Sequence, residues 1–290
     1  TRNLDQTRSY LSGGKVEADT SPRSMMLQRI AGHLPLLVHP DPHRAVNIGL
    51  GAGVSLGALG SHPLDELTVV EIEPAAVEVA RRFGPFNHHI MDRPGLQVVM
   101  GDGRNFLFCT TDRFDVITSD PFEPVHTGAN HLYTVEHFRQ ARACLAPGGI
   151  LSQYVPLYEL SQQDFLTIVR SFAAVFPDSV LFYTGDDTIL LGFNGPVKIS
   201  ARTLREHFLE PAVRSSLGEL GFTRPETLLG MFVADLRTTP QLTRPGPLNT
   251  DDRPRVEFSA PKNALRYTNF DNTQVLLDIF TDLPAELLDG

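Results

Sequence analysis

The stretch AVNIGLGAG, residues 45–53, decides the fold. A short apolar strand runs into three glycines at alternate positions, Gly49, Gly51 and Gly53, and a helix pattern follows. A ligand can approach such a backbone closely because no side chains stand in its way. A dinucleotide fingerprint would need a glycine at position 54, where Val54 stands. The spacing favours an adenosyl-sulfonium ligand over a pyrophosphate, and a purely structural turn is the alternative.

Strand and helix patterns alternate after this turn. Apolar strands are predicted at 45–48, 67–70, 96–100, 115–119 and 150–155, with an antiparallel pair at 180–183 and 188–193. Such alternation is typical of a parallel sheet with crossover helices. Seven strands with a closing hairpin predict an α/β fold, namely the Rossmann-like, seven-stranded class I SAM-methyltransferase fold.

Three regions are predicted along the chain. Residues 1–40 form an N-terminal extension with a β-hairpin turning at 12–14 and a helix from Ser24 towards Leu37 that Pro35 ends. Residues 41–196 form the Rossmann-like, adenosyl-sulfonium-binding catalytic domain. Residues 197–290 form a C-terminal extension, with helices over 201–235, a loop over 238–254 and a short helix at 274–288.

Composition excludes several kinds of partner. The net charge is −9 and the pI is near 5.5, whereas nucleic-acid binding usually needs a basic stripe; an acidic cleft instead suits a cationic substrate. Cys109 and Cys144 lack metal-ligand spacing, so we expect no metal and a reducing compartment. No apolar run approaches the roughly 18–20 residues that span a bilayer. We expect a cytoplasmic chain without membrane contact of its own, and the first residue, Thr1, suggests a piece of something longer.

Acidic residues follow the next two strands. Glu71 ends the second strand about 20 residues beyond the glycines, where a carboxylate grips a ribose diol. Glu73 is expected to cap the following helix or to be solvated. Asp102, before Gly103, can accept a hydrogen bond from an adenine amino group, or it is an ordinary turn aspartate. Because ligands of open α/β sheets bind at the carboxyl ends of the strands, these residues predict a nucleoside site.

The fourth strand is followed by DPFEP, residues 120–124. Asp120 follows an apolar strand, so burial is expected to raise its pKa and to suit it to proton transfer. Asp120 and Glu123 on one proline-stiffened loop can hold an ammonium ion and accept its proton. A solvated acidic loop is the alternative, and His126 and His131 are alternative bases.

Taken together, these residues resemble the spermidine synthase (polyamine aminopropyltransferase) family over about residues 8–195. The glycine turn and the tail NTDDRP, residues 249–254, look most like a bacterial spermidine synthase-like subgroup that is often fused to membrane-spanning segments. The segments that carry the family resemblance are HLPL at 33–36, EIE at 71–73, GDG at 101–103, FDVITSD at 114–120 and HLY at 131–133.

The resemblance implies transfer of an aminopropyl group from decarboxylated S-adenosylmethionine to a di- or polyamine, with release of methylthioadenosine, in a homodimer. Asp120 would be the base, while Glu123 and Tyr133 would orient the small amine substrate. The donor-binding residues would be Gln28, Gly49, Gly51, Gly53, Glu71, Asp102, Gly103 and Asp120.

Two departures keep other functions open. Ala52 stands where the family has an aspartate that binds the donor's amine, and Glu123 replaces a second aspartate. Ala52 favours a methyltransferase that uses S-adenosylmethionine itself, because an aspartate at 52 would repel the carboxylate of that donor. A third possibility is a non-catalytic domain that senses a nucleoside or a polyamine. Asp251 and Asp252 either cover the cleft or belong to a surface loop.

Overall fold

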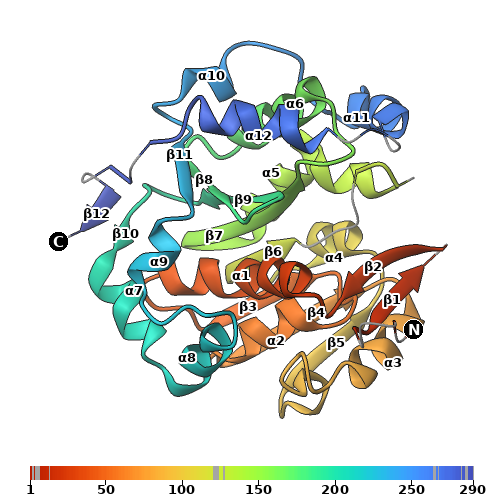
Figure 1. Cartoon of the computed structure of the whole chain (residues 1–290), viewed down its shortest axis with the longest axis vertical. Helices are drawn as coiled ribbons and strands as arrows, with labels where there is room; N and C mark the ends of the chain where they lie inside the picture. The colour runs from red at the N-terminus through yellow and green to blue at the C-terminus, as the bar shows by residue number, and fades with distance from the viewer. Residues whose placement is uncertain are drawn as a thin grey trace.

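A mixed sheet of eight strands forms the centre of the molecule (Figure 1). The structure, a computed structural model, describes residues 1, 3, 7–12, 14–119, 124–126, 128–263, 266, 268–281, 283–284 and 287–289. The strands lie in the order β11-β8-β9-β7-β6-β3-β4-β5. They are β3 (Arg44–Ile48), β4 (Glu66–Glu71), β5 (Leu96–Met100), β6 (Phe114–Ser119), β7 (Leu145–Pro156), β8 (Ser179–Tyr183), β9 (Asp187–Phe193) and β11 (Phe232–Asp235).

All seven predicted strands are present. The strands β5, β4, β3, β6 and β7 pair in parallel, and β9 is antiparallel to both β7 and β8. The sheet grows from β3 first towards β4 and β5 and then, on the other side, towards β6 and β7. The reversal makes the carboxyl end of β3 a topological switch point, where open α/β sheets bind ligands.

The eighth strand, β11, corrects the prediction of helix throughout 201–235. Helices α7 (Ala201–Phe208), α8 (Pro211–Gly218) and α9 (Glu226–Leu229) occupy most of that segment, but its last four residues pair antiparallel with β8. All four are buried. The backbone groups at the edge of β8 need hydrogen-bond partners. Residues 232–235 supply them by pairing as a strand, although their sequence pattern also fits a helix.

Helices cover both faces of the sheet. Buried residues Leu36, Leu56 and Ala80 of one face belong to one apolar cluster, and Leu107 and Phe138 of the other face belong to a second. The first face carries α1 (Pro22–Val38), α2 (Val54–Gly60) and α3 (Pro74–Arg82), and the second carries α4 (Gly103–Cys109), α5 (Val135–Cys144) and α6 (Gln162–Ala173).

Side-chain caps explain where these helices begin. The first N–H groups of a helix have no partner within it, so an oxygen from the preceding residue stabilises the start. In each of five helices, the capping side chain accepts a hydrogen bond from a backbone N–H of the first turn. The caps are Ser21 for α1, Glu73 for α3, Asp102 for α4, Thr134 for α5 and Ser161 for α6.

Helix α1 differs from its prediction, because it continues through Pro35 to Val38. A proline inside a helix loses one hydrogen bond and crowds the preceding turn, but here residues 29–38 are all buried. Gly32 allows α1 to approach α2 closely, since a Cβ atom there would lie 2.4 Å from the Ser55 carbonyl oxygen. Tight packing on α2 therefore offsets the cost of the proline. The predicted domain boundaries stay predictions.

The two terminal regions flank the sheet. The predicted hairpin is present as β1 (Ser9–Ser12) and β2 (Lys15–Asp19). The helices α10 (Pro240–Thr243), α11 (Arg255–Ser259) and α12 (Asn269–Leu277) pack against α6 (Figure 1). The helix predicted at 274–288 begins and ends earlier, as α12. No helix among the described residues is both long and apolar enough to cross a membrane. The remaining elements are η1 (Ile90–Asp92), η2 (Ala129–Tyr133), β10 (Ile199–Ser200), η3 (Ala260–Asn263) and β12 (Leu288–Asp289).

Candidate active site

A cavity of about 1140 Å³ lies at the carboxyl ends of the parallel strands. The hairpin strand β2, helix α1 and η2 close it from the sides, together with residues that follow β3, β4, β5 and β7. Six of the residues predicted from the sequence line this one cavity: Gln28, Gly49, Gly51, Glu71, Asp102 and Gly103.

The glycine turn needs its glycines for conformational reasons. Gly49, Gly51 and Gly53 have φ angles of 92°, 50° and 76°, a left-handed region that disfavours residues with a Cβ atom. Gly49 and Gly51 line the cavity, whereas Gly53 lies just behind it as the N-cap of α2. The turn thus presents bare backbone to a ligand, and Gly53 acts through the backbone path rather than as a wall of the cavity.

Glu71, at the end of β4, is hydrogen-bonded to the backbone of the glycine turn. It is only 6% exposed. One carboxylate oxygen accepts hydrogen bonds from the amides of Leu50 at 2.7 Å and Gly51 at 3.4 Å, and the other accepts from the Glu73 amide at 2.7 Å. An ionised carboxylate has about four acceptor positions. A position therefore remains for a ligand hydroxyl, in keeping with the ribose contact predicted for this residue.

Asp102 caps a helix and also lines the cavity, and its contact with an adenine amino group stays a prediction. One oxygen caps α4 by accepting from the Asn105 amide at 2.7 Å, and the residue also lines the cavity. Gly103 follows with no room for a side chain, since a Cβ atom would lie 2.3 Å from Ile48 Cγ2. On the opposite wall, the amide nitrogen of Gln28 donates to the Ser24 hydroxyl at 2.9 Å, which fixes the Gln28 side chain.

Asp120 and Glu123 lie outside the described residues. The strand that precedes them is described, and Ser119 at its end pairs with Ile48 of β3, itself a lining residue. The chain therefore leaves β6 beside the glycine turn. Roles for Asp120 and Glu123 stay predictions.

Tyr133 lies away from the cavity surface. Its side chain is fully buried in the apolar cluster around α5 and α6, and the residue is not among those that line the cavity. Contact with an amine substrate stays a prediction for this residue. The alternative bases His126 and His131 do line the cavity.

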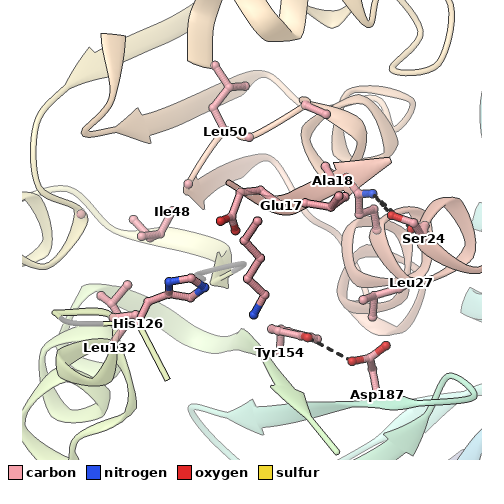
Figure 2. A pocket seen from close by; sticks show the side chains of 18 of the residues that line it. Glu17, Ala18, Ser24, Leu27, Ile48, Leu50, His126, Leu132, Tyr154 and Asp187 are labelled. Carbon is pink, nitrogen blue, oxygen red and sulfur yellow. Dashed lines mark hydrogen bonds between the residues drawn. The ribbon is translucent and has the colours of Figure 1, made fainter. Parts of the chain in front are cut away.

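A polar group on the far wall of the cavity was not predicted from the sequence (Figure 2). Tyr154 on β7 donates its hydroxyl hydrogen to Asp187 Oδ1 at 3.0 Å, and its oxygen lies 2.9 Å from the Tyr158 hydroxyl. Asp187 is 3% exposed and begins β9, where it pairs with Pro156 at the end of β7. Ligands of open α/β sheets bind at the carboxyl ends of the strands, so the position of Tyr154 near the end of β7 was the signal that could have identified it.

The hairpin contributes charged side chains to the same cavity. Glu17 on β2 points into it (Figure 2), and Lys15 forms an ion pair with Glu159 at 2.9 Å. The cavity is therefore lined by the carboxylates of Glu159 and Asp187 near Tyr154 and by that of Glu17 across from them (Figure 2). Within the described ranges, no group of three or more His, Cys, Asp or Glu side chains is arranged to hold a metal.

The fold is that of a Rossmann-like α/β protein of the class I methyltransferase type, with a cavity at the switch point of its sheet. The family model described as "Spermine/spermidine synthase domain" matches residues 25–186, more than half of the chain. The chain therefore belongs to the spermine/spermidine synthase family.

Curated relatives support the same family. The chain is 31% identical over 212 residues to the polyamine aminopropyltransferase of Pectobacterium carotovorum subsp. carotovorum, an alignment covering 69% of this chain and 71% of the relative. It is 35% identical over 154 residues to the polyamine aminopropyltransferase of Erwinia tasmaniensis, covering 52% and 53%. The chain thus spans about half the length of the latter relative. These relatives are enzymes, and they favour aminopropyl transfer over methyl transfer or sensing.

Solved structures agree on the fold. A spermidine synthase from Thermotoga maritima matches with a TM-score of 0.61, 20% identity and 76% coverage of each chain. A spermidine synthase in complex with the transition-state analogue AdoDATO matches with a TM-score of 0.60, again with 20% identity and 76% coverage of each chain.

Proposed function

We propose that the chain transfers an aminopropyl group from decarboxylated S-adenosylmethionine to a di- or polyamine and releases methylthioadenosine. One observation carries this proposal: a single cavity has a glycine turn, Glu71 and Asp102 on one wall and the acidic Tyr154–Asp187 group on the other. A nucleoside donor and a cationic acceptor thus each find complementary groups in one space. The complex of a related fold with AdoDATO supports the same donor.

The donor wall binds by hydrogen-bond acceptors and bare backbone. Glu71 keeps an acceptor position for the ribose hydroxyls, and Asp102 keeps its second oxygen for the adenine amino group. Gly49 and Gly51 let the backbone approach the sulfonium side of the donor. These contacts orient the donor without any protein group having to react with it.

The acceptor wall offers negative charge on a buried side chain. Asp187 is almost fully buried, and its Oδ1 accepts a hydrogen bond from the Tyr154 hydroxyl. A buried carboxylate forms strong charge-assisted hydrogen bonds with an ammonium group. We infer that Asp187, together with Glu17 across the cavity, holds the acceptor amine and selects against neutral molecules.

In the reaction, the acceptor nitrogen attacks the carbon beside the sulfonium in line. A new C–N bond forms while the C–S bond breaks, and methylthioadenosine leaves with the bonding electrons. An alkylammonium, like lysine, has a reference pKa near 10.4, so it must lose a proton before it attacks. Asp120 is the proposed base. The sulfonium already carries its charge, so the protein contributes mainly by positioning the two partners.

Ala52 shapes how the donor's own amine is held. It lines the cavity and is almost fully buried, so it offers no charge where the family has an aspartate. In this chain the amine of the aminopropyl group must therefore be met by other carboxylates of the cavity.

The test is identification of products by mass spectrometry. The enzyme would be given decarboxylated S-adenosylmethionine or S-adenosylmethionine, each with a panel of diamines and polyamines. We expect an aminopropyl adduct and methylthioadenosine with the first donor only. A methylated product without any aminopropyl adduct would instead establish a methyltransferase, and nucleoside binding without turnover would establish a sensor.

We also propose a cytoplasmic homodimer. The two cysteines, Cys109 and Cys144, are both free, as suits a reducing compartment. Light scattering at micromolar concentration measures the mass, and a monomer of 32.0 kDa would contradict the dimer.

A further inference from the structure

We propose that the C-terminal loop Asn249–Pro254 is a positioning element of the active site, although it lies outside the segment that matches the family model. This proposal rests on the proposed function. The loop contacts two walls of the cavity: it binds η2 through Asn249, and it binds the first turn of α4 through Asp251.

Asn249 anchors the loop at the junction between η2 and α5. It is fully buried. Its side-chain nitrogen donates to Asn130 Oδ1 at 2.9 Å and to the Tyr133 carbonyl at 3.0 Å, both in η2. Its own carbonyl accepts from the amide of Val135, the first residue of α5, at 3.0 Å. The end of η2 and the start of α5 are therefore both held by one residue.

Two more contacts fix Asn249 itself. Its amide donates to the Ser171 hydroxyl of α6 at 2.8 Å, and its side-chain oxygen accepts from the Val256 amide at 3.3 Å. Every hydrogen-bonding group of Asn249 thus has a partner, and a buried residue satisfied in this way adopts one conformation. The loop transmits the position of the rigid helix α6 to the wall of the cavity.

Asp251 connects the same loop to the donor side of the cavity. Its carboxylate forms two hydrogen bonds with the Arg104 guanidinium, one of 2.9 Å between Oδ1 and Nη1 and a second between Oδ2 and Nη2. The Arg104 guanidinium beside it lowers the pKa of the Asp251 carboxyl. Arg104 lines the cavity directly after Asp102 and Gly103, and its Nη1 also reaches the His131 carbonyl at 3.4 Å.

The position of η2 matters because four residues from its start and interior line the cavity: Gly128, Ala129, His131 and Leu132. The predicted base Asp120 lies in the connection that joins β6 to η2. The β6 end of this connection is fixed by pairing with β3. The C-terminal loop fixes the other end, so its loss should displace reacting groups, and displacements of about 1 Å cost on the order of 100-fold in rate.

A positioning role and a purely structural role of the Asp251–Arg104 pair predict different effects of Asp251→Asn on stability and on turnover. The Asp251 and Arg104 side chains are 36% and 20% exposed, and partly exposed ion pairs contribute little to stability. Asp251→Asn should therefore leave the melting temperature within about 2 °C of the wild-type value. If the pair positions η2, however, the same substitution lowers turnover.

The experiment compares Asp251→Asn with Asp252→Asn. Asp252 is the next residue along the loop, its side chain is exposed, and it forms no ion pair among the described residues. For each variant we would measure kcat, both KM values, the melting temperature and hydrogen exchange of the amides of 128–133. We expect Asp251→Asn to lower kcat about tenfold or more and to speed exchange in 128–133, while Asp252→Asn changes neither.

The variants Arg104→Gln and Arg104→Gln/Asp251→Asn, together with Asp251→Asn and the wild type, form a double-mutant cycle. A positioning pair predicts that the double variant loses no more kcat than the worse single variant. Wild-type kcat and exchange in Asp251→Asn, or equal losses in Asp252→Asn, would overturn the proposal. If the wild-type chain makes no aminopropyl product, the proposed function fails, but the exchange of 128–133 still decides whether the loop holds η2.

Discussion

Glu71→Gln is the substitution that most directly tests how the nucleoside wall is built. Glutamine has nearly the shape of glutamate, but one carboxylate oxygen becomes an NH2 group, which donates and cannot accept. The Glu71 carboxylate accepts at both oxygens, from the Leu50 amide at 2.7 Å on one side and from the Glu73 amide at 2.7 Å on the other. Whichever way the new amide turns, one backbone N–H faces another donor.

The size of the effect follows from these contacts. A hydrogen bond to a charged group contributes about 1.5–3 kcal/mol, and a buried donor left without a partner costs about 1–3 kcal/mol. Because the two terms describe the same lost contact, we expect the free energy of unfolding to fall by about 2–3 kcal/mol. The acceptor position left for a ribose hydroxyl is disturbed as well, so methylthioadenosine should bind at least about tenfold more weakly, or about 1.4 kcal/mol.

Urea denaturation measures the first quantity, and calorimetric titration with methylthioadenosine measures the second. Glu73→Gln is the matched control: its exposed side chain caps α3 by accepting from the Ala75 amide, and glutamine retains an acceptor oxygen. That control should change the unfolding free energy by less than about 0.5 kcal/mol and leave the affinity unchanged. A Glu71→Gln variant with the wild-type denaturation midpoint and affinity would refute this account of the site.

Four further outcomes are expected. Gly103→Ala should destabilise the fold by about 1–3 kcal/mol in thermal denaturation, because its Cβ atom overlaps a core side chain. Asp120→Asn should abolish turnover yet bind methylthioadenosine normally in calorimetry; full activity would remove Asp120 from the mechanism. Asp187→Asn should raise the KM of the amine about tenfold and spare the KM of the donor, whereas Asp65→Asn on the exposed β3–β4 connection should change neither. Burial lowers the pKa of His62 from 6.5 to about 3, so the unfolded chain binds more protons than the folded chain below pH 6.5. The free energy of unfolding measured in urea titrations should therefore fall by about 2 kcal/mol between pH 7 and pH 5. His62→Gln should lose this part of the pH dependence.

The parallel part of the fold was predictable because its signals are local. Strands such as β3 and β4 are buried at nearly every position, so they stand out as mainly apolar runs, and the glycine turn marks where the first of them ends. The acids at the ends of β4 and β5 follow from the same rule. The cavity is accordingly lined by Glu71 and Asp102, the two acids for which the sequence predicts nucleoside contacts.

The features of the fold and the cavity that the sequence did not predict depend on contacts between distant segments of the chain. Strand β11 forms because the edge of β8 is free to pair, and nothing within residues 232–235 reports that edge. Pro35 is tolerated because α2 packs on the same turn, which only the tertiary structure supplies. Asp187 reaches the cavity through its register with Pro156, thirty-one positions earlier in the chain, so the spacing along the sequence does not indicate it.

The proposed donor and acceptor contacts come from different parts of the sheet, and the antiparallel strand β9 supplies the acceptor contact. The proposed donor contacts belong to the parallel strands and their turns, whereas Asp187, the proposed acceptor contact, belongs to a strand that runs the opposite way beside β7. Changes in the short β8–β9 connection can therefore retune which amine is accepted while leaving nucleoside recognition intact. Grafting that connection between homologues is accordingly a direct route to exchanging acceptor preference on an unchanged donor scaffold.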